Sequence, residues 1–99
     1  MTHTHHVPTA VFGDYEWDTD KAARNIDKHG VSFFEAAAAL QDPHAAYLDA
    51  SAHEQRFAAI GLSPAVRLLY VVHVERGERD RIVSARLATA SEVDFYAQR

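Results

Sequence analysis

Arginine is concentrated in one short stretch of this 99-residue chain. Five arginines occur from Arg67 to Arg86, and the stretch contains no lysine. A planar guanidinium group binds a phosphate through two parallel hydrogen bonds, whereas an ammonium group acts as a point charge. The stretch therefore favours contact with a phosphodiester backbone. The alternative is an exposed strand and turn whose arginines pair with Glu75, Glu78 and Asp80.

The charges are distributed unevenly along the chain. Residues 1–52 contain 3 Lys or Arg against 8 Asp or Glu, while residues 53–99 contain 7 Arg against 6 Asp or Glu. The formal net charge of −4 argues against a protein that coats nucleic acid through bulk positive charge. The average conceals a C-terminal half that is slightly basic, and only through arginine.

Several polar side chains could carry acid–base chemistry if neighbouring strands bring them together. Cleavage of RNA without a metal requires a base for the 2′-hydroxyl, cations for the charge on phosphorus and an acid for the 5′ oxygen. Alternation predicts that Glu54 and Arg56 share one face of a strand, directly after His53. It also predicts that His73 and Glu75 share one face of the next strand. We expect these groups on a single open face of the sheet, which is either a catalytic site or only the solvent side of a half-buried sheet with cross-strand ion pairs.

Two further arginines lie on the strand that follows. The positions of Arg81 and Arg86 differ by an odd number, so alternation places the two side chains on opposite faces. A β-bulge between them would return both to one face. At the end of the first helix, Lys28 and His29 are favoured by the helix dipole alone, which is the alternative to a role in binding.

The elements that must position these residues follow from periodicity and turn signals. Residues 1–10 are expected to be a disordered tail, and residues 11–99 a single domain. Strands are predicted at 11–17, 46–49, 54–62, 68–75 and 81–87, and helices at 19–29, from 32 to 40 and from 89 onward. Short connections between the later strands predict an antiparallel meander. The expected fold is an α+β domain in which an antiparallel β-meander sheet packs against two N-terminal helices, with a C-terminal helix.

Capping residues and side-chain sizes refine this expectation. Asp18 is predicted to cap the first helix and Gly30 to end it. Capping boxes are predicted at Ser32 with Glu35 and at Thr89 with Glu92. Four consecutive alanines let the second helix approach a sheet closely, and most of its buried area is expected from Phe33, Phe34 and Leu40. On the strand at 68–75, the side chains expected to fill the core are Tyr70, Val72 and Val74.

Several classes of protein are excluded by what the sequence lacks. There are no cysteines, so disulfides, thiolate metal sites and cysteine nucleophiles are absent. No apolar run is long enough to span a bilayer, and the N-terminus does not resemble a secretory signal. No zinc motif or phosphate-binding glycine loop occurs, so we expect neither a metal nor a cofactor. The expected location is the cytoplasm, with no contact to a membrane.

The order and spacing of many short motifs resemble the BrnT family of type II toxins. The resemblance covers roughly residues 12–97. The segments that carry it are Tyr15-Glu16-Trp17-Asp18 with Lys21, Ala22 and Asn25, Lys28-His29-Gly30-Val31-Ser32-Phe33, Glu35-Ala36, Asp42-Pro43, His53-Glu54 with Arg56, Ile60-Gly61 with Ser63, Arg67 with Leu69, Glu75-Arg76-Gly77, Arg81-Ile82-Val83-Ser84-Ala85-Arg86, and Ala88-Thr89.

The resemblance implies a RelE-like fold and a ribonuclease toxin that cleaves RNA without a metal or cofactor and blocks translation. It implies a BrnA-type antitoxin as protein partner, which neutralises the toxin and alone provides the contact to operator DNA. On this basis the catalytic residues are expected among His53, Glu54, Arg56, Glu75, Arg81 and Arg86, and the RNA-binding residues are expected to be Lys28, His29 and Arg76. Within these sets we expect His53 or Glu54 to be the base and Arg56, Arg81 and Arg86 to bind phosphate.

Two other functions remain open from the sequence. The chain could be a catalytically weak or inactive partner of a DNA-binding antitoxin, acting in autoregulation of their operon. It could also be an enzyme for a small molecule, but so short a chain can hardly enclose the deep pocket that this requires.

Overall fold

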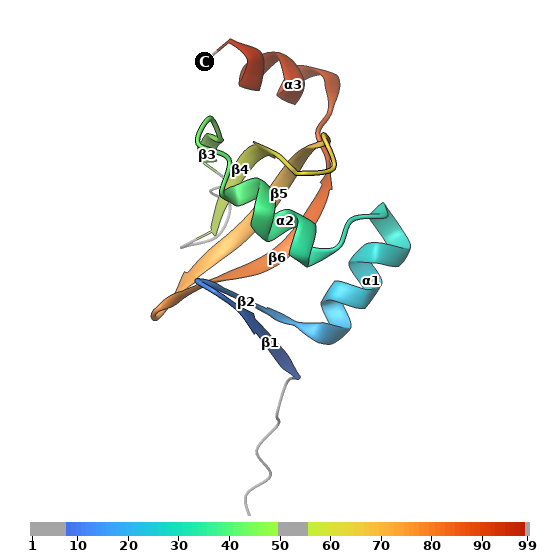
Figure 1. The fold of residues 1–99 in the computed structure, drawn as a ribbon, viewed down its shortest axis with the longest axis vertical. Helices are drawn as coiled ribbons and strands as arrows, with labels where there is room; N and C mark the ends of the chain where they lie inside the picture. The colour runs from blue at the N-terminus through green and yellow to red at the C-terminus, as the bar shows by residue number, and fades with distance from the viewer. Residues whose placement is uncertain (1–7, 50–55, 99) are drawn as a thin grey trace, which may run out of the picture.

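The computed structural model describes residues 8–49 and 56–98. Figure 1 shows a sheet with helices packed on it and a C-terminal helix at one end. The elements in chain order are β1 (Thr9–Phe12), β2 (Tyr15–Asp18), α1 (Thr19–His29), α2 (Phe33–Leu40), β3 (Ala46–Asp49), β4 (Arg56–Leu62), β5 (Leu68–Arg76), β6 (Arg79–Leu87) and α3 (Ala90–Ala97). The α+β class is therefore confirmed.

The sheet is mixed, which corrects the expected antiparallel meander. Its six strands have the order β1-β2-β6-β5-β4-β3, and β2 pairs with β6 in parallel. Only β3 to β6 form the meander. A parallel neighbour needs a long connection, and here the whole chain from α1 to β5 provides it. Spacing along the sequence predicts pairing between successive strands but not this distant contact.

The expected single strand at 11–17 is a hairpin of two strands. Gly13 has a φ of 59°, in the left-handed region that glycine adopts without strain, and it turns the chain between Phe12 and Tyr15. The hairpin begins at Thr9, two residues before the expected start of the domain. The first seven residues of the expected tail lie outside the described residues.

The core lies between the sheet and α2. The alanines of this helix allow the close approach that the sequence predicted, since Ala36 and Ala39 are fully buried. Opposite them, a β-carbon on Gly61 would lie 2.1 Å from the carbonyl oxygen of Ala39. Phe33 is buried as expected, but Phe34 is 58% exposed and lies edge-on against Trp17 and Phe12 on the surface. The expectation for Phe34 was therefore wrong.

The face of β5 that fills the core is also opposite to the expected one. Leu69, Val71 and His73 are buried, whereas Tyr70, Val72 and Val74 are half-buried on the other face. Both sets alternate correctly. Both are largely apolar, so alternation alone does not determine which set α2 covers.

The predicted helix caps are largely confirmed. Asp18 accepts hydrogen bonds from the first turn of α1, and Gly30 ends it with a φ of 68°. At α3, Thr89 and Glu92 form the complete capping box. At α2 only half of the box forms, because Ser32 accepts from the Glu35 amide while the Glu35 carboxylate turns away.

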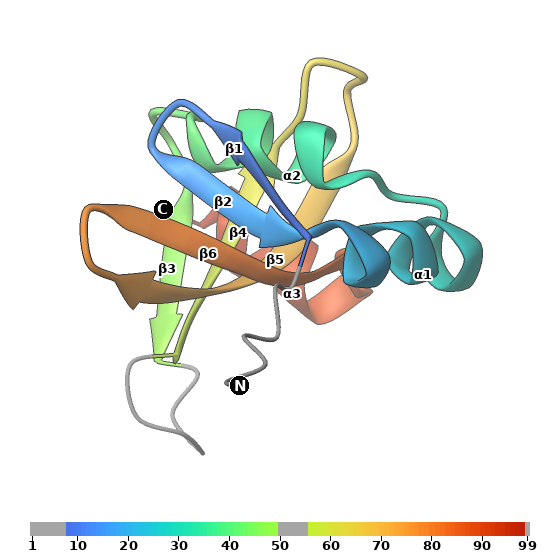
Figure 2. The same cartoon turned by 90° about the horizontal axis from the view of Figure 1, so that it is seen from below.

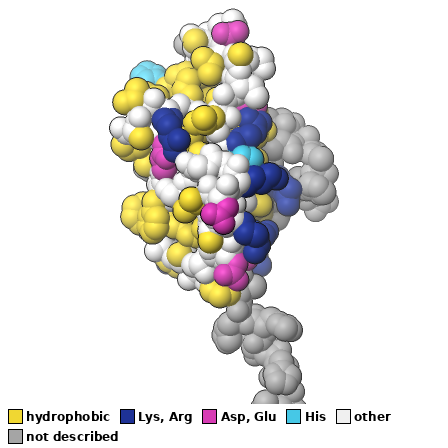
Figure 3. All heavy atoms as spheres, turned by 90° about the vertical axis from the view of Figure 1, so that its right-hand side faces the viewer, with side chains coloured by type: hydrophobic (Ala, Val, Ile, Leu, Met, Phe, Trp, Pro, Cys, Tyr) yellow, Lys and Arg dark blue, Asp and Glu magenta, His cyan; other side chains and the backbone are white. Residues whose placement is uncertain are grey.

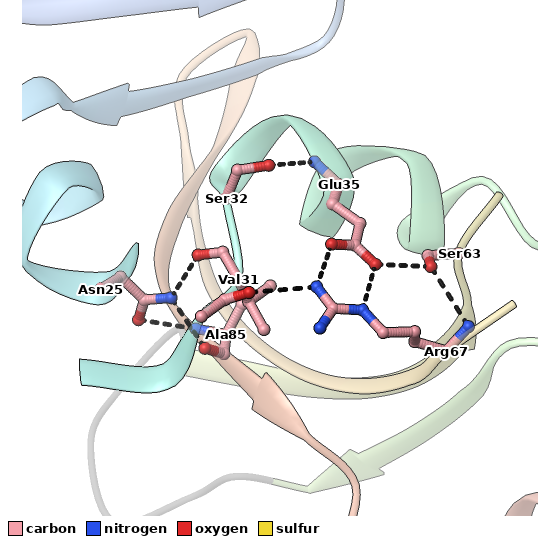
Figure 4. Close-up of polar contacts among 8 residues, drawn as sticks. Asn25, Val31, Ser32, Glu35, Ser63, Arg67 and Ala85 are labelled. Atoms are coloured by element: carbon pink, nitrogen blue, oxygen red, sulfur yellow. Dashed lines mark hydrogen bonds and ion pairs between the residues drawn. The ribbon is translucent and has the colours of Figure 1, made fainter. Parts of the chain in front are cut away.

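That carboxylate holds a polar network between the helices and the turn before β5 (Figure 4). Glu35 pairs with both Nε and Nη2 of Arg67 and accepts a hydrogen bond of 2.7 Å from Ser63. Arg67 also donates to the carbonyl oxygen of Gly30. The hydrogen bond with Arg67 lowers the pKa of Glu35. Arg67, the first arginine of the basic stretch, is thus a structural residue.

The position of α1 beside β6 depends on a buried asparagine (Figure 4). The Asn25 side chain donates to the carbonyl oxygens of Val31 and Ala85 and accepts from the Ala85 amide. Its amide thus pairs with the edge of β6 as a strand residue would. Figure 2 shows α1 beyond the end of β2, where it continues the sheet's layer next to β6.

Within the described part of the chain, no helix is long and apolar enough to cross a membrane.

Candidate functional site

A β-bulge places Arg81 and Arg86 on the same face of the sheet. In the β5–β6 ladder, Arg86 is opposite Tyr70 and Arg81 is opposite Val74. Tyr70 and Val74 are four residues apart on one strand and therefore share a face. The register shifts between these two pairs, and Val83 has no partner in the ladder. Alternation predicted opposite faces unless a bulge intervened, and the structure contains such a bulge.

Four arginines gather on this face around Val74. Arg56 on β4 and Arg81 on β6 are the two neighbours of Val74 across the sheet, and Arg76 is opposite Arg79 two ladder pairs further along the hairpin. Neighbouring strands are about 4.8 Å apart, so the backbones of Arg56 and Arg81 are about 10 Å apart. Two arginine side chains that start at this distance can reach the same phosphate group. We call Arg56, Arg76, Arg79 and Arg81 the arginine cluster.

A carboxylate from β2 orients one member of the cluster. Glu16 is in register with Arg81 across the parallel pair, and its Oε2 lies 3.1 Å from the Nε of Arg81. Both side chains are only 18% exposed. The parallel pairing that the sequence did not predict therefore supplies the acidic residue of this site.

The other three members of the cluster have no ion pair among the described residues. The Nε of Arg79 is buried and also lacks a hydrogen-bond partner in this part of the chain. The cluster is thus suited to hold a phosphate and to stabilise negative charge that develops on it.

Arg86 shares the face but not the position of the cluster. It lies four ladder pairs from Arg81, about 13 Å along the strands. Its guanidinium stacks 4.1 Å from the ring centre of Tyr70 and binds both oxygens of Glu92 at 2.8 and 3.0 Å. This hydrogen bonding lowers the pKa of Glu92 and raises that of Arg86. In this structure Arg86 anchors the first turn of α3.

A groove lined by cations leads from the cluster along α1. It consists of two adjoining hollows of about 210 and 340 Å³ that share Lys21 and Val83. Lys28 and His29 line one hollow, and Arg76 and Arg81 line the other. The groove thus brings together all three residues that the sequence analysis expected to bind RNA, which are Lys28, His29 and Arg76. Figure 3 shows a band of Lys and Arg side chains on this side of the molecule. We define the basic groove by its polar lining: Asp18, Lys21, Arg24, Asn25, Lys28, His29, Arg76, Arg81 and Ser84.

Of the remaining expected site residues, the structure describes His73 and Glu75, and neither joins this face. His53 and Glu54 lie outside the described residues. His73 and Glu75 lie on the opposite face from Arg56, because Arg56 is in register with Val74 and not with its neighbours. The expected grouping of Arg56, His73 and Glu75 on one open face was therefore wrong. The prediction failed because it assigned the wrong alternating set of β5 side chains to the core.

The environment of His73 is that of a core residue. It is 6% exposed, its ring lies 5.8 Å from that of Phe57, and its Nδ1 is 3.8 Å from an oxygen of Asp80. Neither ring nitrogen has a hydrogen-bond partner among the described residues. Burial lowers the pKa of His73, against the opposing effect of Asp80 and Glu75.

Sequence reasoning gave no site role to Arg79, Lys21 and Arg24, or to Glu16, which pairs with Arg81. Arg79 belonged to the basic stretch, but the turn was expected to extend through it. Lys21 and Arg24 are spaced with Lys28 as one stripe of a helix, a signal that was available. Glu16 had no local signal, because its position depends on the distant β2–β6 pairing.

Among the described residues, no group of three or more His, Asp or Glu side chains is arranged to hold a metal ion. Among the described strand residues, the carboxylates on the same side of the sheet as the arginine cluster are Glu16 and Asp18, both from β2, whereas Glu75 and Asp80 pair on the other side. Asp18 is used to cap α1.

Comparison with known proteins identifies the family of this chain. The family described as the ribonuclease toxin BrnT of type II toxin–antitoxin systems matches residues 17–92. A crystal structure of the Brucella abortus ribonuclease toxin BrnT is similar with a TM-score of 0.59 and 26% identity, covering 74% of this chain and 92% of that one. No curated protein matches the chain. Since the family match spans most of the chain, including β6 and the residues of the basic groove, this chain belongs to the BrnT family of ribonuclease toxins of type II toxin–antitoxin systems.

Proposed function

We propose that this chain is an endoribonuclease that cleaves RNA without a metal ion, with the arginine cluster holding the phosphate that is cut. The observation that carries the proposal is the placement of four arginines from three neighbouring strands on one face, around Val74. Membership of a family of ribonuclease toxins supports the same chemistry. Fixed guanidinium groups provide the positive charge that a metal ion would otherwise supply.

In the proposed reaction, the 2′-oxygen attacks the adjacent phosphorus and the 5′-oxygen leaves. His53 or Glu54, directly before β4, remains our expected base for the 2′-hydroxyl proton, and its conjugate acid would return a proton to the leaving oxygen. Arg56, Arg79 and Arg81 would bind the non-bridging oxygens as their charge increases. Glu16 keeps Arg81 oriented before the substrate arrives.

A type II toxin has a protein antitoxin, and we propose that this partner is of the BrnA type. It would provide the contact to operator DNA, so that the toxin meets DNA only through its partner. Free toxin would cut RNA in the cytoplasm and thereby inhibit translation. An antitoxin segment lying across the arginine cluster would neutralise it by occlusion.

One observation favours a second candidate, a toxin-like partner with little catalysis of its own. Both described strand carboxylates on the arginine side of the sheet are already engaged, Glu16 with Arg81 and Asp18 at the start of α1. A chain without a free base would bind RNA or an antitoxin and not cleave. It would then act mainly in regulating its operon.

Expression in bacteria distinguishes the two candidates. We expect expression of the chain alone to stop growth and degrade RNA, and co-expression of the antitoxin gene beside it to restore both. Arg56→Ala and Arg81→Ala should abolish toxicity while circular dichroism shows a retained fold. Unhindered growth and intact RNA with a folded wild-type chain would refute the ribonuclease proposal.

A further inference from the structure

The distribution of cations along the chain is the starting observation. The described residues up to Asp49 contain only three Lys or Arg, against eight Asp or Glu. All three cations, Lys21, Arg24 and Lys28, line the basic groove. Of the eight acids only Asp18 lines it, and its Oδ1 accepts hydrogen bonds from the amides of Asp20 and Lys21. An acidic half of the chain thus presents a basic surface at one place.

Helix geometry gives this surface its shape. Lys21, Arg24 and Lys28 have the spacing i, i+3, i+7, which forms one stripe along α1. Seven residues of α-helix extend about 10 Å, so the stripe is long enough to follow more than one phosphate. The three hydrogen bonds of Asn25 to Val31 and Ala85 hold the helix against β6 and keep the stripe in place.

The opposite wall connects the groove with the arginine cluster. Arg76 and Arg81 belong to the cluster and also line the hollow that contains Lys21. The second hollow continues from Lys21 to Lys28 and His29. A chain of phosphates could therefore pass from the cluster along α1 without leaving a basic surface.

We propose that the basic groove binds the backbone of a single-stranded RNA segment next to the phosphate that is cut. This inference rests on the proposed function, because that function makes RNA the ligand of the adjoining cluster. The apolar lining is limited to Ile82 and Val83, which is little for the core of a protein interface. Repeated cations with few apolar groups match the repeating charge of a nucleic acid backbone.

The test measures binding of a 2′-O-methyl RNA oligonucleotide, which cannot be cleaved, by fluorescence anisotropy at several salt concentrations. The logarithm of the affinity for single strands falls with the logarithm of salt concentration by about 0.7 for each phosphate contact. The double variant Lys21→Gln/Arg24→Gln should therefore lower this slope by about 1.4 and weaken binding about tenfold at moderate salt.

A matched control separates the groove from net charge. Ala23→Glu lies on an exposed position of α1 outside the groove and changes net charge by the same amount as Lys21→Gln. We expect it to bind the oligonucleotide as wild type does. An unchanged salt slope in the double variant, or a loss in Ala23→Glu equal to that of Lys21→Gln alone, would overturn the proposal. Unchanged RNA affinity with weaker binding of the purified antitoxin would overturn it in favour of a protein site.

This measurement also distinguishes failure of the groove from failure of the proposed function. Binding of the uncleavable oligonucleotide does not depend on catalysis, whereas Arg56→Ala should remove cleavage of ordinary RNA. If wild type cleaves RNA and the groove variant keeps its salt slope, only the groove proposal is wrong. If wild type cleaves no RNA, the proposed function is wrong, whatever the salt slopes are.

Discussion

The arginines of this chain differ in what they contact, and the contact determines the role of each. Arg67 is tied to Glu35, and Arg86 is tied to Glu92 and stacked on Tyr70. These two arginines join helices to the sheet. Of the arginine cluster, only Arg81 has a carboxylate partner among the described residues. Residue type and spacing predicted phosphate binding for all of them, but the partners separate the structural arginines from those available to a ligand.

The buried His73 predicts a dependence of stability on pH. Burial lowers the pKa of this histidine below its ordinary value of 6.5, so the unfolded chain takes up a proton first as the pH falls. The stability that neutral His73 provides is therefore complete above about pH 6.5 and decreases as the solution is acidified below it. We expect His73→Phe to lose less stability than wild type between about pH 7.5 and 5.5.

Urea denaturation at several pH values checks this prediction. The other histidines are the same in both proteins, so only the difference between the two curves is informative. Parallel curves would mean that His73 is equally protonated in the folded and unfolded states.

At the scale of elements, close packing without side chains holds α2 against the sheet. The β-carbon that Gly61→Ala adds would lie 2.1 Å from the Ala39 carbonyl oxygen, and a backbone atom cannot move aside cheaply. We expect a loss of about 3 kcal/mol, at the upper end for overpacking. Gly77→Ala is the control, because its β-carbon meets open space and costs about 1 kcal/mol through its positive φ alone. Equal losses in thermal denaturation would contradict the packing of α2 described here.

The anchoring of α1 gives a second prediction at this scale. Asn25→Asp keeps the size of the side chain but replaces its two donated hydrogen bonds with a carboxylate facing the carbonyl oxygens of Val31 and Ala85. We expect it to lower the free energy of unfolding by about 3 kcal/mol or more, and Asn25→Ala by about 2 kcal/mol. The two variants are compared by urea denaturation. A milder effect of Asn25→Asp than of Asn25→Ala would show that the donated hydrogen bonds do not hold the helix.

How far the sequence predicts these elements depends on how local their causes are. Asp18, Gly30 and the Thr89–Glu92 box act within one turn, and their predictions were confirmed. The parallel pairing of Glu16 with Arg81 joins distant segments and left no signal. The sequence did not predict the bulge at Val83; it indicated only that a bulge would be needed to place Arg81 and Arg86 on one face. The core-facing side of β5 was chosen wrongly because its two sets of side chains are both largely apolar.

Over the whole molecule, the two faces of the sheet have different tasks. The face under α2 holds the main core, which includes Leu69, Val71 and Ile82. The other face carries the arginine cluster and meets the basic groove at its edge. A net charge of −4 is therefore compatible with a local basic path for a polyanion, because most acidic residues lie away from it. The basic stretch in the sequence indicated this chemistry, but only the fold shows which arginines share the path.

The central claim is that the arginine cluster carries RNA cleavage, and single-turnover cleavage by the purified chain tests it most directly. The substrate is a single-stranded RNA in buffer with EDTA, and the variants are Arg56→Ala and Arg79→Ala, with Ala23→Glu as the control for net charge. We predict that each arginine variant lowers the cleavage rate constant by about 10²- to 10³-fold while the control matches wild type. Rate constants for both arginine variants within a few fold of wild type would contradict the account.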